Sequence, residues 1–185
     1  MHQLINLSLQ RILIDEFPLK NSFVDLEKIK FNALKNYWGE YRKINNKNDY
    51  RYNYFNVTDD KNITWIIDYF RNNYRLQEKK YVLKPQYSFL IQETNEIIET
   101  HNEIIPTDLE NSPDTSVIYT VDCGEKPVDI IFETKFKGVL PQKIRVPMKK
   151  NNYIIFNSSL KRSFAVNENK KPLINLHFSF FEKDI

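Results

Sequence analysis

The segment Glu99–Ile104, with the sequence ETHNEI, places a histidine and a carboxylate two positions apart. His101 is one of three histidines in the chain, and Glu103 follows it after a single asparagine. On an extended strand, side chains two positions apart point to the same face, so His101 and Glu103 would lie next to each other. An imidazole and a carboxylate in this arrangement can bind one metal ion. The same pair also fits a solvated polar edge of a β-sheet, and the sequence leaves both interpretations open.

The composition is that of a globular domain with a weak charge signal. Apolar residues make up 41% of the 185 residues, and 27 basic against 24 acidic residues give a net charge of +3. This charge is too small to indicate a nucleic-acid partner. Cys123 is the only cysteine, which excludes a disulfide framework within the chain. No apolar run approaches the ~20 residues of a membrane span, so we expect a cytoplasmic protein without membrane partners, or a virion component if a phage encodes it.

Hydrophobic periodicity predicts one strand and two helices before residue 80. Apolar and polar residues alternate over Leu4–Phe17, which is typical of a strand. In Val24–Trp38 and in Asn62–Tyr74 the apolar residues recur at steps of three and four, which predicts two helices. Asn21 or Ser22 is expected to cap the first helix.

From Lys80 onwards, short apolar runs separated by Pro, Asn, Asp and Gly predict about eight short strands. The last run alternates, with Ile174, Leu176, Phe178 and Phe180 on one face and Asn175, His177 and Ser179 on the other. So many short strands are typical of a sandwich, a jelly roll or a small barrel. We therefore expect a single domain over residues 1–185, in which a strand and helical support (1–79) packs on a β core (80–185).

The order of these segments resembles the double-stranded β-helix of the 2-oxoglutarate/Fe(II)-dependent oxygenases, in particular the phage-encoded and prolyl-hydroxylase-like members. Three segments carry the resemblance, in family order: YSFLIQETNEIIETHNE, TSVIYTVDCGEKPVDIIFE and PMKKNNYIIF. It implies an α+β, mainly β fold, a jelly roll of the cupin-like kind with two N-terminal helices packed on one sheet. It also implies Fe(II) and 2-oxoglutarate as cofactors if the protein is active, and no cofactor if it is not.

The resemblance assigns metal ligands that this sequence supplies only in part. His101 and Glu103 stand at the positions of the first histidine and the carboxylate. The second histidine is expected at position 162, where this chain has Arg162. An arginine is not a metal ligand, because its guanidinium stays protonated and offers no lone pair. Arg162 would therefore replace the site, in an ion pair with Glu103.

Two other residues are candidates for the missing roles. The cation that binds 2-oxoglutarate in this family is expected at position 172, which is Pro172 here, directly after Lys171. His177 lies on the opposite face of the last strand from position 172 by alternation. If the register of that strand is shifted by one residue, His177 is a third metal ligand and Lys171 binds the co-substrate.

Three functions are compatible with this pattern. The first is an oxygenase that hydroxylates a protein or a small-molecule substrate. The second is a catalytically inactive jelly-roll module that binds protein partners in an assembly, for example a phage virion or tail. A third is a metal-free, cupin-like domain that binds a sugar or a nucleotide sugar. An assembly protein is expected to expose a broad apolar or aromatic patch and to oligomerise.

Overall fold

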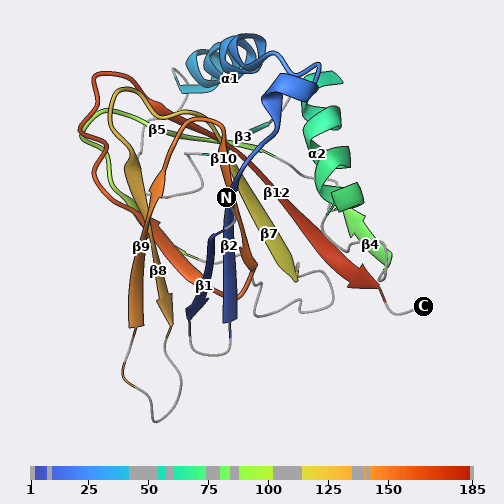
Figure 1. Cartoon of the computed structure of the whole chain (residues 1–185). Coiled ribbons are helices and arrows are strands. Elements are labelled where there is room, and N and C mark those ends of the chain that lie inside the picture. The colour runs from blue at the N-terminus through green and yellow to red at the C-terminus, as the bar shows by residue number, and fades with distance from the viewer. Residues whose placement is uncertain are drawn as a thin grey trace.

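The computed structural model describes residues 3–7, 10–41, 54–56, 61–73, 80–83, 88–101, 114–134, 140 and 142–183. Two antiparallel sheets face each other, and two helices cover the outer side of the larger sheet (Figure 1). The expected mainly β fold with two helices on one sheet is confirmed. In the described part of the chain, no helix is both long enough and apolar enough to cross a membrane.

The larger sheet contains eight strands. They are β1 (Gln3–Leu7), β2 (Gln10–Glu16), β3 (Tyr54–Asn56), β4 (Lys80–Leu83), β5 (Ser88–Gln92), β7 (Thr115–Asp122), β10 (Asn152–Asn157) and β12 (Leu173–Lys183). Their order is β1-β2-β10-β7-β12-β5-β3, and β4 pairs with the end of β12.

The smaller sheet contains four strands in the order β6-β11-β8-β9. They are β6 (Ile98–His101), β8 (Val128–Thr134), β9 (Gln142–Met148) and β11 (Lys161–Phe164). The eight strands β5 to β12 thus divide equally, with β5, β7, β10 and β12 in one sheet and the others in the facing sheet. This division is the jelly roll that the sequence predicts.

The predicted strand over Leu4–Phe17 is in fact two strands that pair with each other. β1 runs antiparallel to β2, with Leu7 opposite Gln10, and β2 continues the sheet by pairing with β10. Alternation of apolar and polar residues persists through both strands, so it did not reveal the reversal between them.

Both predicted helices are present, with their ends shifted by less than one turn. They are α1 (Leu26–Tyr41) and α2 (Lys61–Asn73). Asp25 is the cap of α1, because its carboxylate accepts a hydrogen bond from the Lys28 amide at 3.1 Å. The expected caps are wrong: the Ser22 hydroxyl donates to the Leu19 carbonyl and closes a 3-10 turn (Leu19–Asn21) before the helix.

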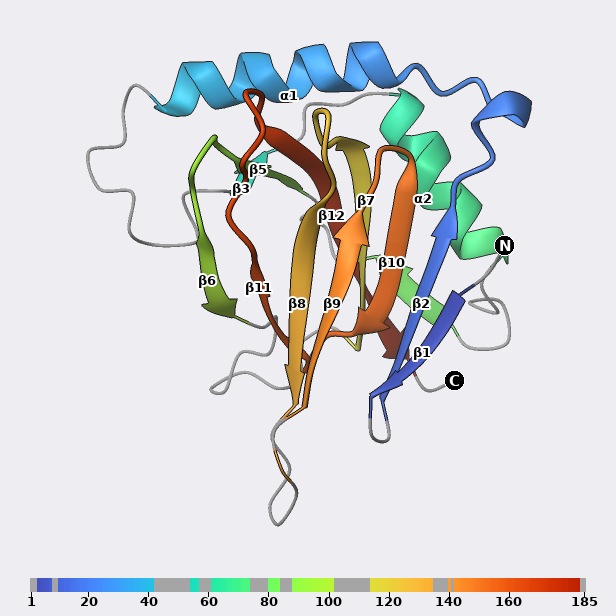
Figure 2. The same ribbon diagram turned by 60° about the vertical axis from the view of Figure 1, so that its left-hand side comes forward.

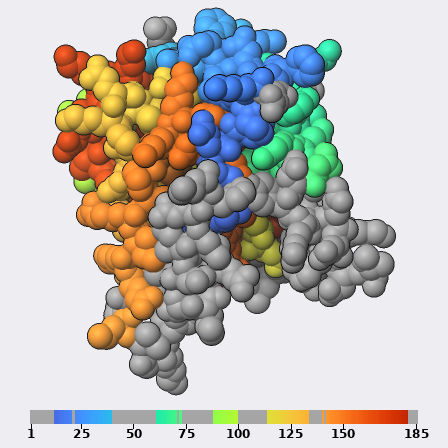
Figure 3. All heavy atoms as spheres, in the orientation of Figure 1, coloured from blue at the N-terminus to red at the C-terminus, as the bar shows by residue number. Residues whose placement is uncertain are grey.

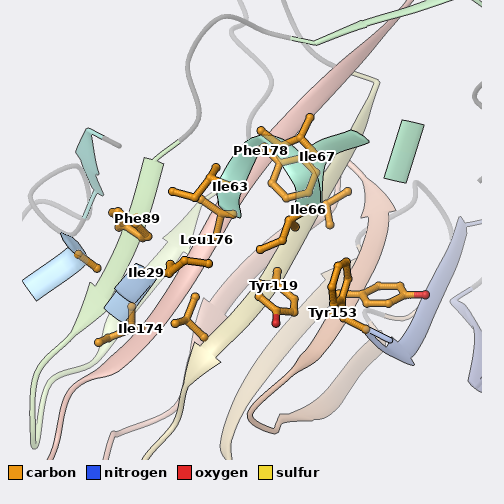
Figure 4. Close-up of a cluster of buried hydrophobic side chains, with 14 of the residues drawn as sticks. Ile29, Ile63, Ile66, Ile67, Phe89, Tyr119, Tyr153, Ile174, Leu176 and Phe178 are labelled. Carbon is orange, nitrogen blue, oxygen red and sulfur yellow. The ribbon is translucent and has the colours of Figure 1, made fainter. Parts of the chain in front are cut away.

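Each face of the larger sheet packs against a different layer. Its outward face meets α1 and α2 in an aromatic and aliphatic cluster (Figure 4). Its inward face meets the smaller sheet in a second cluster that includes Leu90, Ile118, Phe132 and Phe156. The alternation predicted for β12 follows this division, because Ile174, Leu176, Phe178 and Phe180 belong to the outward cluster. Burial on both faces explains why nearly every described side chain of β7 and β12 is buried.

Two polar contacts fix α1 to the ends of the strands beneath it. Lys30 Nζ lies 2.5 Å from Asp122 Oδ2, and the Tyr37 hydroxyl donates to Glu93 Oε1 at 2.5 Å. Burial alone would raise the pKa of Asp122, but hydrogen bonds from Lys30 and the Gly124 amide outweigh it and lower the pKa below its usual value. The hydrogen bond to Asp122 raises the pKa of Lys30.

Phe70 is expected to be the most sensitive position of the outward core. Its ring lies 4.7 Å from that of Tyr153 and 5.3 Å from that of Phe178, and its side chain is fully buried. We expect Phe70→Ala to lower the free energy of unfolding by about 3–5 kcal/mol, measured by urea denaturation. Leu140→Ala, at an exposed apolar residue, should change it by less than about 0.5 kcal/mol. Equal effects of the two substitutions would contradict this packing.

The contact between α1 and β7 gives a prediction about pH. Asp122→Asn should lower the free energy of unfolding by about 1–3 kcal/mol at neutral pH, because a partly buried ion pair is lost. A carboxyl with a lowered folded-state pKa stabilises the protein above its unfolded-state pKa of about 3.9 and loses that effect as the pH falls further. The difference between the two proteins should therefore be constant from pH 7 to about 5 and shrink below about pH 4.

The control is Asp129→Asn, which removes an exposed pair in which Arg145 Nη1 lies 3.5 Å from Asp129 Oδ2. Exposed pairs contribute about 0–1 kcal/mol, so this variant should stay close to wild type throughout. A difference for Asp122→Asn that grows in acid would show that the carboxyl is not stabilised in its charged form.

Candidate functional site

Arg162 and His101 lie directly opposite each other on neighbouring strands. β11 pairs with β6 with Arg162 opposite His101, and on its other side β11 pairs with β8 with Arg162 opposite Phe132. The Arg162 side chain is 0% exposed, whereas its neighbour Lys161 is exposed. Because alternate residues face opposite sides of a strand, Arg162 points into the space between the two sheets. The position that the resemblance assigns to the second histidine is therefore inside the jelly roll and beside the position assigned to the first.

The side chains of both residues of the predicted metal pair, His101 and Glu103, lie outside the part of the chain that the structure describes. The backbone of His101 ends β6, but its side chain is not among the described ones, and Glu103 lies outside the described residues. Metal binding by His101 and Glu103, and the ion pair of Glu103 with Arg162, stay predictions.

The guanidinium of Arg162 packs against an aromatic wall. Its Cζ lies 5.1 Å from the centre of the Phe156 ring, and that ring lies 5.0 Å from the ring of Phe132. A cation over an aromatic face is stabilised by the ring quadrupole, by about 0.5–2 kcal/mol according to how far it is desolvated. Complete burial of an arginine is otherwise costly and rare in proteins. The strand and its aromatic neighbours thus hold a positive charge in the interior.

His177 faces the same interior from the opposite sheet. It is buried on β12, where it lies opposite Ser88 of β5 and Ile118 of β7. It shares the inward face of β12 with Leu173, which packs in the inward cluster. The expectation that His177 needs a shifted register is therefore wrong, because Pro172 precedes the strand and the inward face consists of odd-numbered residues.

Lys171 does not reach this interior. It is exposed, and it lies in the turn before β12, where its carbonyl accepts a hydrogen bond from Asn167 Nδ2 at 3.0 Å. Its expected role in binding 2-oxoglutarate stays a prediction, which the exposed position of Lys171 does not support. The described side chains of β12 that face inward are Leu173, Asn175, His177 and Ser179. Among them, only His177 has a titratable side chain.

The interior contains further buried polar groups that the sequence did not identify. The Ser116 hydroxyl lies 2.7 Å from Ser158 Oγ and 3.1 Å from Ser179 Oγ, which forms a closed hydroxyl cluster. Asn175 lies opposite Thr120, and both ends of its amide and the Thr120 hydroxyl are buried without a protein partner. Buried polar atoms of this kind usually bind ordered water or a polar ligand. The sequence signal for these groups was the polar face that alternation predicts for the last strand. The sequence did not show that this face is buried, because the facing sheet buries it.

Two asparagines shape the turn between β11 and β12. Asn167 Nδ2 donates to the Gln92 carbonyl at 3.0 Å, and Asn169 Nδ2 donates to the Lys126 carbonyl at 2.8 Å. Gly124 is in the left-handed region at φ 73°, and a Cβ there would lie 2.9 Å from Asn169 Cβ. This turn sets which residues of β12 face inward, and its side-chain contacts are not visible in the sequence.

The described residues do not fit an iron ion bound in the manner of the oxygenases. A permanently charged guanidinium stands at the position that the resemblance assigns to the second histidine, where it offers a metal ion no lone pair and repels a cation. The inward face of β12 supplies no arginine or lysine among its described side chains to pair with a 2-oxoglutarate carboxylate.

Arg162 should be essential for stability, unlike its exposed neighbour. Arg162→Ala removes the contact with Phe156 and leaves a cavity between the sheets, so we expect a loss of about 3 kcal/mol in the free energy of unfolding. Lys161→Ala on the same strand is the matched control and should change it by less than about 0.5 kcal/mol. Chemical denaturation of both variants measures the difference, and a neutral Arg162→Ala would contradict the buried position.

Comparison by sequence identifies no relative, since neither a family model nor a curated protein matches the chain. Comparison by structure identifies several. The non-heme alpha-ketoglutarate-dependent carbocyclase SnoK from nogalamycin biosynthesis has a TM-score of 0.64 at 8% identity, over 92% of this chain and 80% of that one. A prolyl-4-hydroxylase from Pseudomonas putida has a TM-score of 0.58 at 10% identity, over 94% and 93%.

A third similar structure is AviO1 from Streptomyces viridochromogenes, with a TM-score of 0.53 at 10% identity, over 85% of this chain and 84% of that one. Identities this low establish a shared fold and not a shared reaction. The order of strands in the two sheets agrees with the fold that the sequence resembles. The chain therefore has the double-stranded β-helix fold of the 2-oxoglutarate/Fe(II)-dependent oxygenase superfamily.

Proposed function

We propose that this protein is a catalytically inactive relative of the oxygenases that serves as a binding or assembly module. The observation that carries the proposal is the complete burial of Arg162 opposite His101. An interior that holds a fixed positive charge at a ligand position disfavours a divalent cation at the same place. The fold and its interior are retained, while the chemistry of the metal site is replaced.

The exposed aromatic residues of the helical layer support the assembly role. Phe23 is 90% exposed, Phe31 66% and Trp38 52%, and all three belong to α1 or its approach. Exposed aromatic side chains that gather on one element mark a surface for another protein more often than isolated ones do. The partners we propose are proteins of an assembly, of which a phage virion or tail is one example.

A second candidate function is an active oxygenase that hydroxylates a protein or small-molecule substrate. The inward orientation of His177 favours it, because a second histidine does face the interior. In this alternative, His101, Glu103 and His177 would hold Fe(II), which would supply the oxidising chemistry with 2-oxoglutarate. Arg162 would then have to lie away from the metal.

Iron binding separates the two functions. Titration of metal-stripped protein with Fe(II) under anaerobic conditions, by calorimetry, should give no binding up to high micromolar metal. Addition of 2-oxoglutarate should give no charge-transfer band near ~500 nm, the band expected of a chelate at an open facial-triad site. Tight binding with that band would establish the oxygenase, and His177 would be the first residue to replace.

Arg162→His tests the reason for the loss of iron binding. If Arg162 occupies the place of the second histidine, this substitution should create measurable Fe(II) affinity where the wild type has none. Arg162→Gln is the control, because it also removes the charge but adds no imidazole. Equal metal binding by the two variants, or none by Arg162→His while it stays folded, would contradict the assignment of position 162.

A further inference from the structure

Three buried polar side chains on neighbouring strands have four atoms without a hydrogen-bond partner in the described part of the chain: Thr120 Oγ1, Asn175 Oδ1, Asn175 Nδ2 and Gln92 Oε1. All three residues are 0% exposed. Gln92 is held by its other end, because its Nε2 donates to the Glu96 and Ala165 carbonyls at 2.7 Å each. Buried polar groups are nearly always hydrogen-bonded, so these four atoms indicate an occupant that the protein itself does not supply.

The strand register places the three side chains next to one another. Asn175 of β12 is opposite Thr120 of β7 on one side and opposite Leu90 of β5 on the other. Gln92 is opposite Leu173, two residues before Asn175, which makes Gln92 and Asn175 diagonal neighbours. Leu90 and Leu173 pack in the inward cluster, and alternate residues of a strand share a face, so Gln92 and Asn175 point inward. Thr120 points the same way, because directly opposite residues of a sheet share a face.

An apolar wall encloses these polar atoms. The inward cluster that contains Leu90 and Leu173 also contains Ile98 and Phe164 of the smaller sheet. Figure 2 shows the strands of the smaller sheet in front of β7 and β12. On the face of the molecule shown in Figure 3, α1, α2 and β9 form much of the visible surface. The three polar side chains are uncharged, so this part of the interior offers hydrogen bonds rather than a counter-charge.

We propose that Thr120, Asn175 and Gln92 form a binding site for a small neutral molecule that carries a primary carboxamide. A carboxamide has two N–H donors and a carbonyl with two lone pairs. Its donors match Asn175 Oδ1 and Gln92 Oε1, and its carbonyl accepts from Asn175 Nδ2 and from the Thr120 hydroxyl. All four buried atoms are then satisfied, and the carbon skeleton of the ligand lies against the apolar wall.

The same donors and acceptors disfavour a carboxylate, including that of 2-oxoglutarate. A carboxylate only accepts hydrogen bonds, so it offers no donor to Asn175 Oδ1 or to Gln92 Oε1. Among the described side chains, the inward face of β12 also has no arginine or lysine to pair with it. An alcohol has one donor and satisfies only one of the two acceptor oxygens. The inference goes beyond the proposed function, because neither a metal ion nor a protein partner takes part.

Titration of the full chain with three probes of the same carbon skeleton tests the proposal. The probes are isobutyramide, isobutyrate and isobutanol, each added at pH 7 up to about 10 mM, since a small ligand with a few hydrogen bonds is expected to bind with a dissociation constant of about 1 mM. The side-chain amide signals of Asn175 in two-dimensional NMR spectra of nitrogen-15-labelled protein report on the site directly. Isobutyramide should shift these signals in a saturable way, and the other two probes should not. Because the site is fully buried, each sample is incubated until its spectrum is constant.

Two substitutions that keep the shape of the side chain test the residues. Asn175→Leu should abolish detectable binding of isobutyramide, and the loss of its amide signals also assigns them. Thr120→Val removes one of the four hydrogen bonds and should weaken binding about fivefold to tenfold. Both variants should stay folded, because replacing an unpartnered buried polar group by an apolar group of similar shape leaves no new unsatisfied atom. Thr115→Val makes the same change on the opposite face of β7 and should bind as the wild type does.

Several results would overturn the proposal. One is a wild type that does not respond to isobutyramide, which would leave ordered water as the occupant of the site. Others are an equal response to isobutyrate, or binding that Thr120→Val leaves unchanged. A response to isobutanol alone would assign the site to a hydroxylated ligand instead. None of these measurements involves iron or a protein partner, so failure here and failure of the proposed function are distinguishable.

Discussion

The antiparallel pairing of β7 with β12 is the contact on which both layers of the molecule depend. Each strand is buried on both faces, so each must present two different surfaces at once. The outward side chains pack on the helices, and the inward ones form an apolar cluster with the smaller sheet that also contains buried polar side chains. A shift of one residue in this pairing would exchange the two surfaces, placing Asn175 and His177 under the helices and Phe178 between the sheets. The same register therefore secures the core and the candidate site.

Under the proposed function, the interior keeps the fold of the similar structures and holds the positive charge of Arg162. An iron site depends on a divalent ion that several ligands share, whereas Arg162 supplies a single positive charge that is covalently part of β11. A guanidinium needs no metal supply and no open coordination position, and its donors have a fixed geometry. Under the proposed function, such a replacement removes the capacity to bind a metal ion at that position. Similar folds can therefore differ completely in chemistry.

The sequence predicts the parts of this structure that depend on local pattern. The helices and the two faces of β12 follow from periodicity, and the position of Arg162 follows from the order of the family segments. The hairpin of β1 and β2 was missed because alternation continues through both strands. The orientation of His177 was misjudged because it was inferred by counting residues from Arg162. That count crosses the turn that Asn167 and Asn169 shape, and alternation does not continue through a turn. Burial of Asn175 and Thr120 depends on the facing sheet, which no local pattern specifies.

The helical layer links the stability of the fold to its proposed use as a binding surface. α1 is fixed at two points, by Lys30 to β7 and by Tyr37 to the end of β5, so its outward face is presented on a rigid support. A rigid face loses little conformational freedom on association, which matters most for a small interface. Glu27 contributes to this attachment, because its carboxylate contacts both Lys30 of α1 and Lys150 of the turn before β10. The ion pairs that hold α1 on the sheet thus also fix the helix whose exposed aromatic residues the proposed assembly role depends on.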